Sequence, residues 1–181
     1  LMLHLQETAF LTSGLEIILY DRTCADDAGS NVCCFRYQNG LRDFISFMND
    51  GQPALYSDIL YGQWGTEDIQ AEFALIYNTS YEEKLLSFAN NISTPEGGTH
   101  VSGFRQVNEY ARKQGLLKEC DSSLSRDELS EGMVAIVSVR LKDPQFEGQT
   151  KQKLGSSSAR PVVDRLVYEK VTLFLEQNPQ A

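Results

Sequence analysis

The stretch "MVAIVSVRL", residues 133–141, decides the fold of this chain. Its first half is almost entirely apolar or β-branched, so apolar and polar side chains do not alternate there. A strand with this pattern has to be covered on both faces, whereas a half-exposed strand alternates. We therefore predict that residues 133–141 form the central strand of a sheet.

Other stretches have the β-branched and aromatic content of strands, and polar or glycine-containing segments separate them. In one of them, Ala71, Phe73, Leu75 and Tyr77 fall on a single side. Their short spacing favours antiparallel pairing. The strands predicted in this way are residues 15–21, 31–37, 58–65, 69–78 and 82–91.

Helical periodicity appears in four segments. Residues 1–11 repeat apolar positions at helical spacing, and "LRDFISFMND" (41–50) places Leu41, Phe44, Ile45 and Met48 on one stripe. A helix is also predicted over residues 101–114, with Gly115 as its stop, and a long one over residues 161–177, because Pro161 suits a first turn.

These elements predict an α+β domain with helices on one face of a mixed, mostly antiparallel sheet. The connection from the strand near residue 85, through the helix at 101–114, to the strand at 133 would make part of the sheet parallel. Periodicity leaves the strand order and the handedness of that crossover open.

Composition excludes several classes of protein. The 181 residues are 41% hydrophobic and carry a net charge of −9, which fits one acidic globular domain and disfavours general nucleic-acid binding. We find no apolar run long enough to span a membrane and no signal peptide, so we expect a cytoplasmic protein without membrane contact. The start within a helix suggests a piece of a longer chain.

Catalytic and metal-binding patterns are sparse. Cysteines at positions 24, 33, 34 and 120 lack zinc-site spacing, and we expect reduced structural thiols. His4 lies in the leading helix, and His100 is expected to form local hydrogen bonds rather than act as a base. No nucleophile elbow, zinc-protease motif or phosphate-binding P-loop is present in the sequence.

The polar stretch "DPQFEGQTKQKLG" (143–155) follows the central strand directly. In an extended loop, Gln149 and Lys151 would share a side, and an amide with an ammonium could then hold a phosphate. An ordinary solvated loop explains the same residues equally well on chemistry alone.

The longer motifs add to this interpretation. "DPQFEGQTKQKLG", "FANNISTPEGGTHVSGFR" (88–105) and "EGMVAIVSVRLKDPQF" (131–146) resemble, in this order, the transducer domain of the B-type polypeptide of bacterial DNA gyrase and its counterpart in topoisomerase IV. The resemblance covers about Glu7 to Pro179. It implies that residues 1–181 are a gyrase B transducer domain that ends in a long helix, with a fold similar to domain 2 of ribosomal protein S5 and a left-handed βαβ crossover.

The resemblance also implies a function. Gln149, Thr150 and Lys151 match the family's Gln-Thr-Lys loop, whose lysine contacts the γ-phosphate of ATP bound, with Mg²⁺, in an N-terminal ATPase domain of the same chain. The domain would couple ATP binding and hydrolysis to DNA strand passage and supercoiling, with gyrase A as partner and DNA bound only in the assembled enzyme. Because the catalytic glutamate and lid belong to the N-terminal domain, this chain alone is expected to be inactive.

Arg105 and Arg112 lie seven residues apart on the predicted helix and are candidates to face DNA, although a solvated basic face is the simpler interpretation. The family likeness does not separate gyrase from topoisomerase IV. "SSSARPVVD" carries Ser158 and Ala159 where the family tends to have an acidic residue and a valine. Two alternatives remain, a ribosomal-protein-like RNA-binding module and an interaction domain in which the Lys151 loop has no role.

Overall fold

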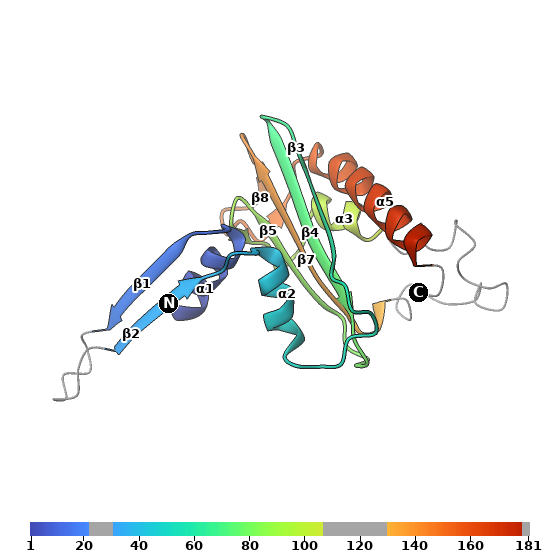
Figure 1. The fold of residues 1–181 in the computed structure, drawn as a ribbon. Coiled ribbons are helices and arrows are strands. Elements are labelled where there is room, and N and C mark those ends of the chain that lie inside the picture. The colour runs from blue at the N-terminus through green and yellow to red at the C-terminus, as the bar shows by residue number, and fades with distance from the viewer. Residues whose placement is uncertain (22–30, 107–129, 179–181) are drawn as a thin grey trace.

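A sheet of five strands forms the centre of the protein (Figure 1). A computed structural model describes residues 1–21, 31–106 and 130–178. The strand order is β3-β4-β7-β5-β6, with β5 and β7 parallel and the other neighbours antiparallel. The prediction of a mixed, mostly antiparallel sheet is therefore confirmed. The strands are β3 (Leu60–Gly65), β4 (Ile69–Tyr77), β5 (Lys84–Ala89), β6 (Ile92–Ser93) and β7 (Met133–Leu141).

β7 is the central strand, as its apolar pattern predicts. All of its residues are buried except Arg140. The side chains alternate between two separate apolar clusters: Ala135 and Val137 belong to one, while Val134 and Ile136 belong to the other. A strand with apolar residues on both faces thus fills two cores, one on each side of the sheet.

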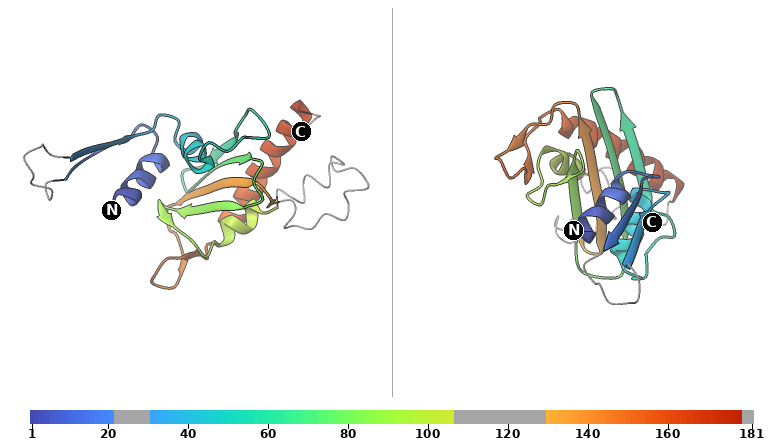
Figure 2. Two further views of the ribbon diagram at one scale, coloured as in Figure 1. Left: turned by 90° about the horizontal axis from the view of Figure 1, so that it is seen from below. Right: turned by 90° about the vertical axis from the view of Figure 1, so that its left-hand side faces the viewer.

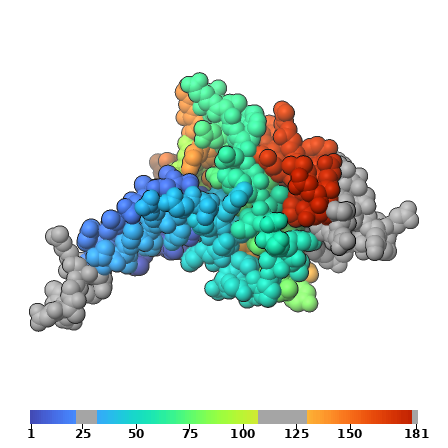
Figure 3. Space-filling view, in the orientation of Figure 1, coloured from blue at the N-terminus to red at the C-terminus, as the bar shows by residue number. Residues whose placement is uncertain are grey.

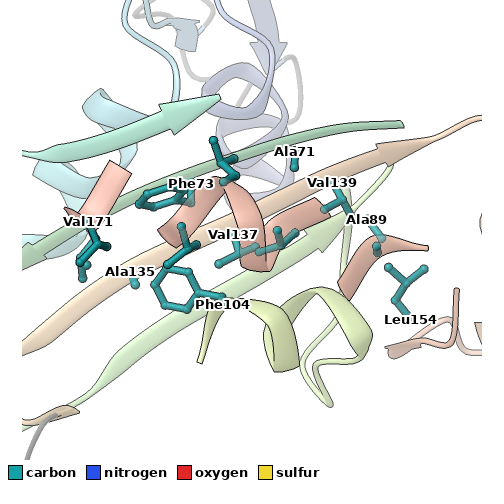
Figure 4. Packing of buried hydrophobic residues seen from close by; sticks show 14 of the residues in the cluster. Ala71, Phe73, Ala89, Phe104, Ala135, Val137, Val139, Leu154 and Val171 are labelled. Atoms are coloured by element: carbon teal, nitrogen blue, oxygen red, sulfur yellow. The ribbon is translucent and has the colours of Figure 1, made fainter. Parts of the chain in front are cut away.

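The larger core lies between the sheet and the helices α3 (Thr99–Phe104) and α5 (Ala159–Gln177). Figure 4 shows Phe73 of β4 and Phe104 of α3 approaching each other, with ring centroids 5.9 Å apart. Gly62 on β3 leaves room for the first of these rings, because a Cβ there would lie 2.6 Å from a ring carbon of Phe73. The aromatic pair and the glycine form a single packing unit.

The second core lies on the opposite face of the sheet, under α1 (Met2–Leu11) and α2 (Leu41–Asn49). Phe10 of α1 stacks on Phe44 of α2, with centroids 4.6 Å apart, and both rings are buried. The expectation of helices on one face is therefore wrong. Because the side chains of β7 are apolar on both faces, each face needs its own cover.

The strands β1 (Glu16–Asp21) and β2 (Asn31–Arg36) form a separate antiparallel sheet. This hairpin extends away from the body of the protein, at the left in Figures 1 and 3. Ile18, Tyr20 and Val32 are exposed on it, and the pairing of Tyr20 with Val32 places them on one face. The body of the domain does not cover this apolar face.

The helix boundaries agree closely with the periodicity. α5 begins at Ala159, two residues before the predicted start, and ends at Gln177 as predicted. α3 begins at Thr99 and ends at Phe104; the rest of the helix predicted over residues 101–114, with Gly115, lies outside the described residues apart from 105 and 106. In the described part of the chain, no helix has the length and hydrophobicity to span a membrane.

Candidate functional site

A short hairpin, β8 (Phe146–Glu147) and β9 (Lys153–Leu154), carries the candidate residues. Figure 2 shows it, in orange, standing out from the body of the domain in both views. The connecting residues 148–152 contain all three predicted contacts, Gln149, Thr150 and Lys151, and each is exposed. The structure therefore brings the three residues together at the tip of a projection.

The loop is a tight turn and not the extended segment that we expected. The Lys151 amide donates to the Gly148 carbonyl at 3.4 Å, and both residues have positive φ, 55° and 82°. Positive φ at these two positions reverses the chain within a few residues. The argument that Gln149 and Lys151 share a side through strand-like alternation is therefore wrong. What joins them is the turn, and Gly148 was the sequence signal for it.

The Lys151 ammonium is available to bind an anion. It forms no ion pair within the described residues, and its closest interaction there is with the Phe146 ring, whose centroid lies 5.7 Å from Nζ. The carboxylate on the same hairpin, Glu147, pairs instead with Lys153 at 2.9 Å and raises the pKa of that lysine. One lysine is therefore neutralised locally, and the other is not.

Hydrogen bonds fix the base of the hairpin. Gly155 N donates to the Gln145 carbonyl at 2.8 Å, and Gln145 N donates to Ser156 Oγ at 2.8 Å. Leu154, at the end of β9, is fully buried in the larger core. The exposed tip is thus held at a defined position relative to the sheet, although the tip itself contacts little.

A second motif of the sequence lies against this base. The turn before α3 contains Gly97, Gly98 and Thr99, and it contacts β9 through backbone atoms and through the Thr99 hydroxyl. Sequence reasoning identified the two motifs separately and missed that they meet. The paired glycines were the available signal, because such pairs often allow two backbones to approach closely.

The arginine candidates are not brought together. Arg105 directly follows α3, and its Nη2 lies 3.1 Å from Glu83 Oε1 in a partly exposed ion pair. Arg112 lies outside the described residues. The pairing of Arg105 with a carboxylate fits an ordinary solvated surface better than a free basic stripe.

His100 has a structural environment. The side chain is fully buried, and Nε2 lies 3.2 Å from the Thr94 hydroxyl. Burial lowers its pKa to about 4, so the ring is neutral near pH 7. This agrees with the expectation of a local hydrogen-bonding residue. His4 is exposed on α1; Cys33 and Cys34 are free thiols, with Cys34 exposed, and Cys24 and Cys120 lie outside the described residues.

The comparison with known sequences is consistent and specific. The family model of DNA gyrase B matches residues 40–181. DNA gyrase B of Clostridium acetobutylicum is 43% identical over 182 aligned positions, which cover 97% of this chain and 28% of that protein. The corresponding protein of Cytophaga hutchinsonii is 40% identical over 97% of this chain and 38% of its own length. The chain thus spans less than half of these relatives.

The fold gives the same result. The crystal structure of the 43K ATPase domain of Thermus thermophilus gyrase B, solved in complex with an aminocoumarin, matches 99% of this chain and 48% of that one. The TM-score is 0.81 at 33% sequence identity. Sequence and fold agree along almost the entire chain, and on these grounds the chain belongs to the DNA gyrase B family.

Proposed function

We propose that this chain is the transducer domain of an ATP-dependent type II topoisomerase of the gyrase B type. It would couple ATP binding and hydrolysis in a neighbouring N-terminal domain to DNA strand passage and supercoiling. The observation that carries the proposal is the position of Lys151, an exposed ammonium without an ion pair in the described structure, at the tip of a hairpin with a fixed base.

The residues present fit a terminal phosphate. The tip offers one cationic donor, and Gln149 adds a side-chain amide on the same turn, while the nearby carboxylate is occupied by Lys153. We assign Mg²⁺ and the rest of the nucleotide to the N-terminal domain. Consistent with this division, the described residues contain no cluster of three acidic, histidine or cysteine side chains that could hold a metal.

The proposed contact would act as a switch. A charge-assisted hydrogen bond contributes roughly 1.5 to 3 kcal/mol, or about a ten- to hundredfold change in an equilibrium. Lys151 would make this contact only while a γ-phosphate is present, so the contact favours one domain arrangement over another. Only residues 155–158 separate β9 from α5, which gives a displaced hairpin a short path to the long helix.

The β1–β2 hairpin is the surface that we assign to the neighbouring domain. Two strands alone are marginally stable in water, and this pair exposes Ile18, Tyr20 and Val32 on one face. A same-chain domain packed there would bury that face and set the distance from which Lys151 reaches the nucleotide. Gyrase A and DNA would join in the assembled enzyme.

The test is Lys151→Ala in the full-length protein, assembled with gyrase A. We expect the rate of ATP hydrolysis to fall about ten- to hundredfold, because one charge-assisted contact to the phosphate is lost. Lys153→Ala is the matched control: it removes a lysine from the same hairpin, but one whose exposed ion pair with Glu147 contributes little. Unchanged hydrolysis in Lys151→Ala would contradict the proposal.

Supercoiling distinguishes gyrase from topoisomerase IV. The assembled enzyme is expected to introduce negative supercoils into relaxed DNA in the presence of ATP. An enzyme that only relaxes and decatenates DNA would identify the topoisomerase IV type instead.

For the two arginines we expect a small effect. Arg105 already pairs with Glu83, so the double substitution Arg105→Glu and Arg112→Glu should leave strand passage within about twofold of the wild-type rate. A strand-passage assay on the complete enzyme checks this. A large loss, with ATP hydrolysis retained, would instead assign these residues to the DNA path.

A further inference from the structure

The turn before α3 meets the base of the Lys151 hairpin along three successive residues. Glu96 N donates to the Gln152 carbonyl at 3.0 Å, and Leu154 N donates to the Gly97 carbonyl at 3.0 Å. Gly98 and Leu154 form an isolated parallel bridge. We name residues 94–99 the glycine turn. We propose that the glycine turn positions the Lys151 hairpin for its phosphate contact and that Thr99 is the positioning residue.

Gly98 makes the close approach possible. A Cβ at this position would lie 2.3 Å from the Leu154 carbonyl oxygen, and the φ of 136° is one that side chains rarely adopt. The backbone of the glycine turn therefore touches the backbone of β9 without an intervening side chain. Any shift of the turn is transmitted directly to the strand that leads back from Lys151.

Thr99 supplies the side-chain bond of this interface. Its hydroxyl donates to the Ser156 carbonyl at 2.6 Å, just beyond the end of β9. The hydroxyl of the same serine accepts from Gln145 N, on the other arm of the hairpin. Ser156 therefore links both arms to α3, and the Thr99 hydroxyl is the α3 side of that link.

The glycine turn is itself tied to the sheet. The Thr94 hydroxyl lies 2.8 Å from the hydroxyl of Ser87, a residue of β5, and 3.2 Å from His100 Nε2. All three side chains are buried. A buried, hydrogen-bonded group of this kind rigidifies its surroundings. The position of the hairpin is thus referred to β5 and, through its parallel pairing, to the central strand.

The inference rests on the proposed function, because it assigns a position to the loop that binds phosphate. Its test is Thr99→Val in the full-length protein, again assembled with gyrase A, with Thr99→Ser as the matched variant. Valine keeps the β-branched shape and removes the hydroxyl, whereas serine keeps the hydroxyl. The loss of one neutral hydrogen bond predicts a roughly two- to tenfold lower kcat for ATP hydrolysis in Thr99→Val, with KM for ATP within about twofold.

Three results separate a positioning role from a purely structural one. We expect Thr99→Ser to restore kcat, and the amides of Glu96 and Leu154 to exchange with deuterium faster in Thr99→Val than in wild type. Wild-type kcat in Thr99→Val, or equal losses in both variants, overturns the inference. If Lys151→Ala is impaired at the same time, the proposed function stands. If Lys151→Ala hydrolyses ATP normally, both the proposed function and this inference fail.

Discussion

Replacing Phe73 with alanine is expected to lower the free energy of unfolding by about 3 to 5 kcal/mol. The side chain is fully buried on β4, packs against Phe104 and belongs to the core under α3 and α5. The neighbouring Gly62 has no side chain that could fill the space left behind. The substitution therefore leaves a cavity in addition to removing apolar surface from the core.

Urea unfolding of the 181-residue chain measures this effect, and an unchanged m-value would show that only stability has changed. Tyr81→Ala is the control, because that aromatic side chain is 84% exposed and its loss should change stability by less than about 0.5 kcal/mol. A loss below about 1 kcal/mol in Phe73→Ala would mean that the core closes around the missing ring, contrary to the packing described above.

Lowering the pH from 7 to 4 is expected to destabilise the wild-type protein by about 3 kcal/mol more than a His100→Asn variant. Burial depresses the pKa of His100 from 6.5 to about 4. Between these two values the unfolded chain binds the proton and the folded chain does not. Stability from this group is therefore fully present above pH 6.5 and is lost as the pH falls toward 4.

The measurement is urea unfolding of both proteins across this pH window. Asparagine retains hydrogen-bonding groups near Thr94 but does not titrate, so the difference between the two pH slopes isolates His100. Absolute stability differs between the variants at every pH and does not affect the comparison. Identical slopes would show that the imidazole is not buried in its neutral form.

Local pattern was sufficient for most elements. The stripe of Leu41, Phe44 and Ile45 predicted α2, and the uninterrupted apolar residues of 133–141 predicted a central strand, because periodicity reflects which side chains are buried. The same strand pattern also carried the information that both faces are covered. It was not used when the helices were assigned to one face, since no local signal says which face a helix covers.

The loop shows a sharper limit. Lysine is an uncommon residue at positive φ, so nothing in "GQTKQ" predicted that Lys151 adopts 55° and closes a turn. The contact of Gly98 with Leu154 joins residues far apart in the chain, and each of the two segments alone has the pattern of a polar loop. Sequence pattern does not encode such pairings, which depend on where the sheet places the two segments.

By itself, the sequence determined the strands, the helices, the family and the residues of the Gln-Thr-Lys loop, because these follow from local periodicity and from motifs of adjacent residues. Only the tertiary structure decided that helices cover both faces of the sheet, that Lys151 stands on a projecting turn without an ion pair in the described structure, and that the glycine turn holds its base. These features depend on contacts between distant segments, which exist only after the sheet has formed.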